Sequence, residues 1–216
     1  GKTMRAGAGL FRIVPDFALS AVRIRVCNGV AAAFAGLFAA PTFATSDVYT
    51  IDPEHTSVIA SWSHFGFSNP TATFHDVEGT IDFDYEMPEN SSISVTLPVN
   101  TVDTYVEKLT NEFHGKDYFN VDMYPMATFE STRVIGKDNN NYEVYGNLTI
   151  HGVTKNVMFN AKLNKKGTHP MTKNETIGFD AHTEIQRSDF GLDKYVPNVS
   201  DSVDIRITTE AQVMDE

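Results

Sequence analysis

The residues of this chain most capable of chemistry lie in one short segment, Arg187-Ser188-Asp189. Arg187 and Asp189 carry opposite charges two positions apart. They could hold their own loop together as an ion pair, or contact the polar end of a ligand. Ser188 lacks the strand–turn–helix surroundings of a nucleophilic serine, and the letters Asp-Phe-Gly have no accompanying kinase motif. We therefore expect no catalytic residues in this chain.

The histidines form the second group of candidates. His64 falls on the apolar face of a strand pattern and His114 lies in a helical insertion described below, so both could contact a ligand's polar end. An isolated histidine is more often a core or turn residue, and His151, beside Gly152 in a tight turn, fits a turn role best. No two histidines on one element face each other with a carboxylate partner, as a metal centre would need. We predict no metal site and no cofactor.

The elements that must position these residues are mostly strands. Apolar and polar residues alternate with a period of two in eight segments: 57–65, 77–85, 92–99, 126–131, 142–150, 153–163, 177–185 and 203–213. Short turns join most of them, and a short strand or arm precedes the first. This pattern predicts an all-β, antiparallel domain with one buried face, either a sandwich or a closed barrel. We favour a closed barrel of about eight strands because closure removes the exposed edge strands.

One stretch, Thr101 to Pro125, breaks the strand pattern. Apolar residues recur at roughly helical spacing at Val102, Tyr105, Val106, Leu109 and Phe113. Asp103 or Thr104 could cap the helix, and Gly115 would end it. A helical, aromatic-rich insertion between strands must cover something. We predict that it covers one side or one mouth of a β-barrel and that the barrel interior holds an apolar ligand.

The barrel interior would supply the walls of that site. The candidate wall residues are Trp62, Phe74, Phe83, Phe129, Phe159 and Phe179, and the candidate lid residues are Leu109, Phe113 and Phe119. Each of them could equally be ordinary core. Small residues on the same faces, such as Gly146 and Ala161, either fit the taper of the barrel or leave room. An eight-stranded barrel is just wide enough to be filled or to hold one slender ligand, and the sequence leaves both readings open.

The N-terminal residues differ from the rest of the chain. Residues 1–44 contain five basic residues, one acid and the apolar run 26–40, followed by small residues up to Ala44, which is typical of a secretory signal peptide. The domain would then span 45–216, with 12 basic and 27 acidic residues and a net charge of −15. Such a surface repels nucleic acid. The sole cysteine, Cys27, lies in the signal segment, so the domain has no disulfide.

Three stretches together resemble the YceI-like family of exported lipocalin-like proteins. They are FHGKDYFNVDMYPMATFES at 113–131, GNLTIHGVTKNV at 146–157 and RSDFGL at 187–192. The resemblance covers about 48–213 and implies an eight-stranded barrel with a helical insertion, a periplasmic or secreted location, and binding of a long polyisoprenoid or isoprenoid-quinone lipid. One departure is Lys116, where many members have arginine. Lysine keeps the charge but loses the planar two-point donor geometry.

The function we predict is therefore a non-enzymatic carrier or sequestering protein whose insertion gates access to a lipid. His64, His114, Arg187 and Asp189 are the candidates for contacts with the lipid headgroup. One alternative is an enzyme acting on a lipid at the barrel mouth, where His114, Asp117, Arg187 and Asp189 would lie close together. Another is a stress-related structural domain with a solid core and no ligand. The sequence permits a homodimer but does not specify one.

Overall fold

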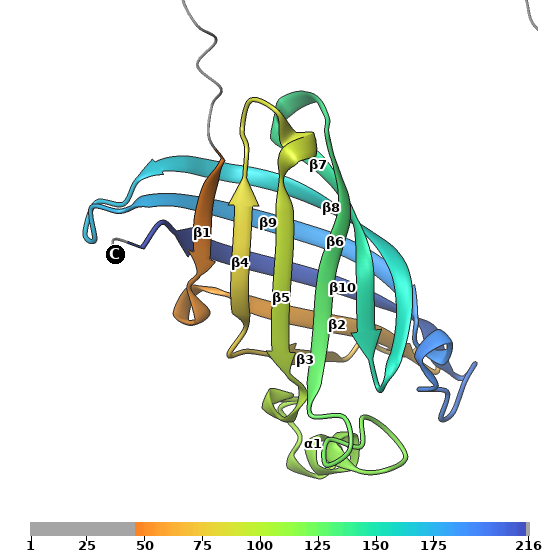
Figure 1. Cartoon of the computed structure of the whole chain (residues 1–216). Helices are drawn as coiled ribbons and strands as arrows, with labels where there is room; N and C mark the ends of the chain where they lie inside the picture. Colours follow the sequence, from red (N-terminus) through yellow and green to blue (C-terminus); the bar gives the residue numbers. More distant parts are fainter. Residues whose placement is uncertain (1–45, 215–216) are drawn as a thin grey trace, which may run out of the picture. The chain divides into compact units, whose positions relative to one another are not determined.

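A computed structural model describes residues 46–214 as one antiparallel sheet of ten strands that curls into a barrel (Figure 1). The predicted signal peptide, residues 1–44, lies outside this range. The strands are β1 Asp47–Ile51, β2 Ser57–His64, β3 Thr71–Phe74, β4 Glu78–Phe83, β5 Ser92–Pro98, β6 Met126–Gly136, β7 Asn141–Ile150, β8 Val153–Thr168, β9 Glu175–Gln186 and β10 Val199–Gln212. Short 3-10 helices lie at η1 Pro53–His55, η2 Pro88–Asn90, η3 Val99–Thr101, η4 Asp138–Asn140 and η5 Arg187–Phe190.

Eight of these strands close the barrel. Strand β1 pairs with β4 on one side and with β10 on the other, through Thr50 opposite Gln212 and Ile51 opposite Ala211. The ring therefore runs β1-β4-β5-β6-β7-β8-β9-β10 and returns to β1. This confirms the prediction of an all-β, eight-stranded antiparallel barrel. One detail of the prediction was wrong. Its eight long strands included β2, whereas β1, predicted as a short first strand or an arm, takes that place in the ring.

The error arises because β1 and β2 lie one after the other along the same edge of β10. Strand β10 has 14 residues, so its edge is long enough for both. Between them, Asp52 caps η1 by accepting the amide of Glu54, and Pro53 cannot donate to a ladder. Strand β2 pairs with β10 along one edge and forms a hairpin with β3 along the other. The gap between β3 and β5 is filled by the segment after β5, where Thr73 and Asp103 exchange two backbone hydrogen bonds of 2.9 Å.

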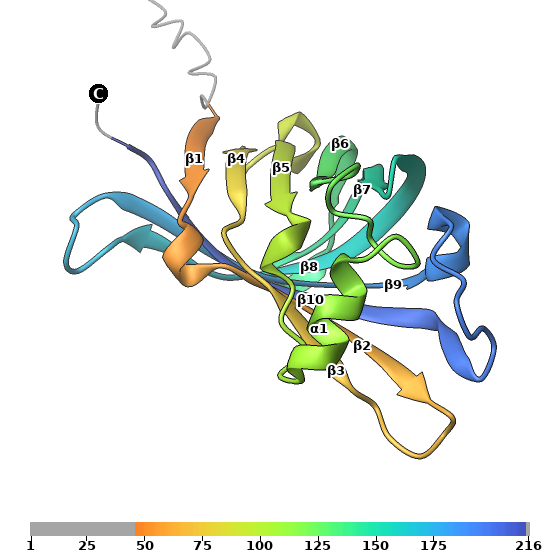
Figure 2. The same cartoon turned by 90° about the horizontal axis from the view of Figure 1, so that it is seen from below.

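The insertion between β5 and β6 lies over one end of the barrel (Figure 2). It contains α1 Glu107–His114, the single α-helix of residues 46–214, and no helix in that range is long and apolar enough to cross a membrane. The predicted helix was too long. Tyr105 has a left-handed φ of 61° and turns the chain, and its side chain is 75% exposed. Neither Asp103 nor Thr104 caps α1, because its N-cap is Val106, which makes no side-chain cap bond.

The end of the barrel away from the insertion is packed solid. Tyr49, Leu163, Ile177 and Ala211 are at most 4% exposed and belong to one continuous apolar cluster. Burial raises the pKa of Tyr49 to about 12, with Asp47 and Glu175 adding to the shift. Residues near the insertion form two smaller clusters. The barrel is therefore filled at the end away from the insertion.

Candidate ligand-binding site

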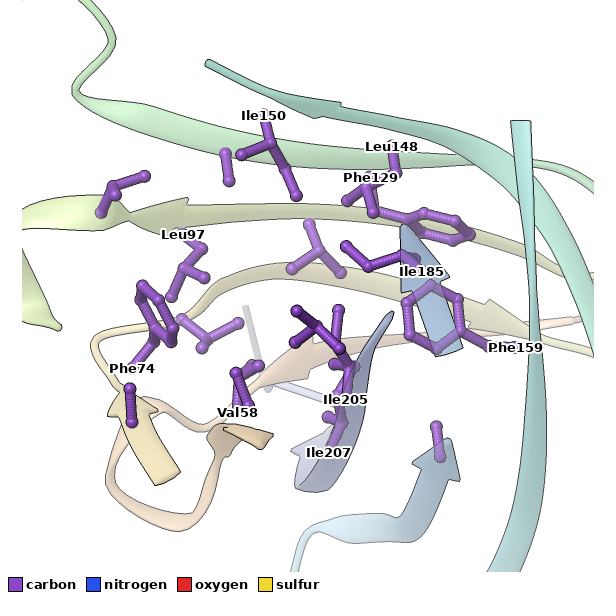
Figure 3. A pocket seen from close by; sticks show the side chains of 18 of the residues that line it. Val58, Phe74, Leu97, Phe129, Leu148, Ile150, Phe159, Ile185, Ile205 and Ile207 are labelled. Carbon is purple, nitrogen blue, oxygen red and sulfur yellow. The ribbon is translucent and has the colours of Figure 1, made fainter. Parts of the chain in front are cut away.

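A cavity of about 510 Å³ occupies the barrel interior and reaches the insertion. Its walls are built by the inward-facing residues of every barrel strand and of the β2–β3 hairpin, so the period-two alternation of the sequence directly produces an apolar lining. Figure 3 shows ten of these side chains directed into the cavity: Val58, Phe74, Leu97, Phe129, Leu148, Ile150, Phe159, Ile185, Ile205 and Ile207. A concave, apolar space of this size is typical of a small-molecule site.

Three aromatic rings close the deep end of the cavity. Phe83 lies edge-on to Tyr142 at 5.7 Å and to Phe179 at 5.4 Å between ring centroids, and Tyr142 lies edge-on to Phe179 at 5.9 Å. All three line the cavity. Burial, and to a smaller extent Tyr85, raises the pKa of the Tyr142 hydroxyl, so this side chain stays neutral. We call these three residues the cavity floor.

Small residues leave room along the walls. Ala60, Ala72, Ala127, Ala161 and Ala181 line the cavity. Gly146 acts differently, because a Cβ there would lie 2.5–2.7 Å from atoms of the Phe129 ring. Because Gly146 has no Cβ, the Phe129 ring can lie against the wall, edge-on to Phe159 with 5.2 Å between ring centroids. The small residues therefore do more than fit a taper, since they keep the space open.

Aromatic contacts attach the insertion to the β2–β3 hairpin. Phe113 packs on Trp62 at 5.7 Å, and Phe119 packs edge-on against Phe74 at 5.8 Å. Phe113 and Phe119 also meet each other at 5.9 Å. All four residues line the cavity, as does Leu109. The insertion is thus a lid whose inner surface forms part of the site.

The charged residues that line the cavity, Glu112, Arg187 and Lys194, gather at its mouth. Lys194 donates to Asp117 of the lid at 3.0 Å, and its ammonium lies 5.3 Å from the ring centroids of both Tyr118 and Tyr195. The hydrogen bond with Asp117 is the main cause that raises the pKa of Lys194. Because Lys194 follows η5 and Asp117 belongs to the lid, this ion pair joins two sides of the mouth.

Arg187 has a structural role at the same mouth. Its Nε donates to the carbonyl of Ser200 at 2.9 Å, its Nη1 to Leu192 at 2.6 Å, and its Nη2 to both Lys194 and Val199 at 2.9 Å. Burial lowers its pKa. Arg187 thus holds its loop, as one of the two alternatives supposed, but it does so without an ion pair to Asp189 within residues 46–214. The backbone carbonyls of the surrounding loop accept the hydrogen bonds of the guanidinium instead.

A family model described as the YceI-like domain matches residues 49–211. The chain belongs to the YceI-like family. Curated relatives are named UPF0312 protein. The one from Azotobacter vinelandii is 35% identical over 164 residues, covering 75% of this chain and 85% of the relative. The one from Yersinia pestis is 34% identical over 176 residues, which cover 81% of this chain and 90% of the relative.

Solved structures agree with this assignment. BcnA of Burkholderia cenocepacia has a TM-score of 0.68 at 26% identity, covering 74% of this chain and 99% of that one. The YCEI protein of Campylobacter jejuni has a TM-score of 0.64 at 29% sequence identity, and the match covers 71% of this chain and 90% of that one. A protein of Saccharophagus degradans, described as a polyisoprenoid binding domain, shares the fold with a TM-score of 0.58 at 13% sequence identity. The match covers 77% of this chain and 98% of that one.

The three stretches that resemble the YceI-like family meet at the lid end of the barrel. Tyr124, from the first stretch, packs edge-on against His151 of the second at 4.7 Å between ring centroids. His151 Nδ1 lies 3.1 Å from the carbonyl oxygen of Phe190 in the third. His151 also has a left-handed φ of 53° in its turn, so it has the turn role expected of it. The family motifs thus build the frame of the mouth.

Most of the residues proposed from the sequence line the cavity, and two do not. Those that line it are Trp62, His64, Phe74, Phe83, Leu109, Phe113, Phe119, Phe129, Phe159, Phe179 and Arg187. His114 lies outside it, with Nε2 3.1 Å from the carbonyl oxygen of Asn100, and Asp189 is exposed on η5. Sequence reasoning missed the aliphatic wall residues, such as Val58, Ile205 and Ile207, although the alternation that predicted the strands also marks their inward direction.

One group of side chains in this YceI-like domain has ligand atoms close enough to hold a cation. Atoms of Asp52, His55 and Glu210 lie within 4.8 Å of one another, and none of the three lines the cavity. His55 Nδ1 and an Asp52 carboxylate oxygen are 2.7 Å apart, which raises the pKa of His55. An ion pair accounts for this contact, so the absence of a native metal stays a prediction.

Proposed function

We propose that this protein binds a long isoprenoid chain, as a polyisoprenoid or an isoprenoid quinone, inside the barrel, and that it carries or sequesters this lipid without catalysis. The observation that carries the proposal is the cavity itself. It measures about 510 Å³ and is lined by aliphatic and aromatic side chains from all barrel strands. A ligand that fills it must be predominantly apolar, because an unpaired polar group buried there would lose its hydrogen bonds to water.

The distribution of charge supports an amphiphilic ligand. The charged lining residues are Glu112, Arg187 and Lys194, which belong to the lid and to the segment after β9. The floor carries no charged group. An apolar tail directed to the floor would leave a polar headgroup near these mouth residues. Burial contributes about 0.8 kcal/mol per methylene-sized group, so the tail alone can provide substantial affinity. The name of the Saccharophagus degradans protein points to the same ligand class.

A binding role is favoured over catalysis by the positions of the candidate catalytic groups. Asp189 and His114 lie outside the cavity, and Arg187 already donates to four carbonyls. An enzyme at the mouth would use His114, Asp117, Arg187 and Asp189. Of these four, only Arg187 lines the cavity, so they are not gathered around one point inside it. General acid–base catalysis needs its groups within hydrogen-bond reach of the reacting atoms.

The test is native mass spectrometry of protein purified from its own cell envelope, followed by lipid extraction. We expect one isoprenoid-type lipid per chain, and delipidated protein should take one up again from detergent micelles. A clean apo mass combined with no uptake of any isoprenoid would refute the proposal. Turnover of an added lipid would instead favour the enzyme.

The proposed site of action is outside the cytoplasm, since residues 1–44 read as a secretory signal. Cell fractionation tests this separately. Protein recovered in the periplasm, with an N-terminus near residue 45, is the expected result. A cytoplasmic protein that retains residues 1–44 would contradict it.

A further inference from the structure

The cavity ends at its floor, although the barrel continues beyond it. Phe83, Tyr142 and Phe179 line the cavity, whereas Leu163 and Ile177, which belong to the same apolar cluster, do not. These two residues are 4% and 1% exposed. The floor is therefore backed by solid packing, and a chain that reaches it has no room to go further.

We propose that the floor sets the upper length of the isoprenoid tail that the protein can bury, with Phe179 as the residue that determines this length. The inference rests on the proposed function and specifies the ligand more narrowly. The tail enters with its distal end first, because the charged lining residues lie at the mouth and the floor is uncharged. Isoprene units beyond the limiting length remain at the mouth.

The expected signature follows from the additivity of apolar burial. Each methylene-sized group moved out of water improves affinity about fourfold. One isoprene unit, with about five carbon atoms, would then gain about 10²–10³-fold before the cost of ordering the chain. Affinity should therefore rise steeply with chain length and level off once the distal methyl groups touch the floor. The length at which it levels off is the quantity that the floor determines.

Phe179 is the best residue to change. Its ring contacts both other floor rings, and it is only partly buried, whereas Phe83 is 4% exposed and Tyr142 is 6% exposed. Phe179→Ala removes the phenyl ring, about six carbon atoms, from the floor, which is slightly more than one isoprene unit. The limiting length should increase by about one unit. Phe179→Leu, a smaller change, serves if the alanine variant does not fold.

Phe129→Ala is the matched control. Phe129 is also a cavity-lining phenylalanine, but it packs against Phe159 on the side wall and does not contact the floor rings. Removing it widens the cavity without deepening it. Affinity for tails of every length should change by a similar factor, and the limiting length should stay the same.

The experiment is competition native mass spectrometry with delipidated protein and equimolar mixtures of prenols, from farnesol and geranylgeraniol to solanesol, delivered from a nonionic detergent. We expect Phe179→Ala or Phe179→Leu to shift the preferred length upwards and Phe129→Ala to leave it in place. An unchanged limit in a folded Phe179 variant, or an equal shift in Phe129→Ala, would overturn the inference while leaving lipid binding intact. If wild-type protein binds no prenol, the proposed function itself fails.

Discussion

Replacing Arg187 with lysine tests whether this residue supports the mouth of the barrel or contacts the ligand. The guanidinium donates to the carbonyls of Leu192, Lys194, Val199 and Ser200, which lie on different sides of it. Lysine keeps the positive charge, but it has a single donor nitrogen and cannot reach carbonyls arranged around a planar fork. Arg187→Lys should therefore leave two or three of these carbonyls without their donor.

The expected loss of stability follows from the number of bonds. A hydrogen bond to a charged group contributes about 1.5–3 kcal/mol, and the partly exposed carbonyls recover some of this from water. We expect the free energy of unfolding to fall by about 2–4 kcal/mol. For a domain of this size, about 2–4 °C of melting temperature is lost per kcal/mol, so the midpoint should fall by about 5–15 °C.

Chemical denaturation with a fitted m-value, together with thermal unfolding, measures this loss. Arg133→Lys is the matched control, because the Arg133 guanidinium is exposed and lies 4.4 Å from the Tyr145 ring centroid without a comparable set of carbonyls. The control should lose less than about 1 kcal/mol. A fully stable Arg187→Lys protein that no longer binds lipid would refute the structural role and make Arg187 a headgroup contact.

Three further changes test other parts of the molecule. Gly79→Ala should cost about 3 kcal/mol or more in chemical denaturation, because Gly79 has φ +153° and its new Cβ would collide with the Ser94 carbonyl. Gly167→Ala, with open space around it, should be nearly neutral. Asp117→Asn removes the ion pair to Lys194, so a fluorescent isoprenoid analogue should leave a few-fold faster in stopped-flow release; Asp122→Asn should not change the rate. The Asp52–His55 pair lowers the pKa of Asp52 and raises that of His55. Its stabilisation is therefore full above the ordinary Asp52 pKa of 3.8 and below the ordinary His55 pKa of 6.5, and is lost outside that window. The difference in melting temperature between wild type and His55→Ala should be largest near pH 5, and a difference independent of pH would contradict the assignment.

The sequence predicted the barrel because a period of two is a local signal that burial on one face produces directly. It could not predict which strands close the ring. Strands β1 and β2 both alternate well enough, and only the length of β10 decides that they share its edge. It also misjudged the start of α1. Tyr105 fits a helical repeat, but its left-handed φ and its hydroxyl contact with Thr73 at 3.0 Å depend on the neighbouring β3 strand.

The candidate site divides in the same way. Inward aromatic residues could be read from alternation, and Phe83, Phe129 and Phe179 do line the cavity. Alternation could not show whether the barrel interior is filled or hollow, because an inward-facing aromatic residue gives the same sequence pattern in both cases. Arg187 was recognised as a charged group in an irregular segment. Its four partners are backbone carbonyls of a loop that folds around it, and no residue type in the sequence marks such partners. The nearby acidic residue Asp189 was therefore the only partner that the sequence suggested.

The stretches that identify the family contribute some lining residues, such as Phe113, Phe129 and Leu148, but most of the lining lies outside them. The recognisable stretches hold the lid, the β7–β8 turn and η5 together through Tyr124, His151 and Phe190. Such contacts require particular side chains, because each depends on a ring edge or a hydrogen bond in a fixed place. The cavity wall requires only apolar residues of suitable volume, since burial is non-directional. The frame of the mouth therefore depends on particular side chains, whereas the walls and the floor depend mainly on apolar character and volume.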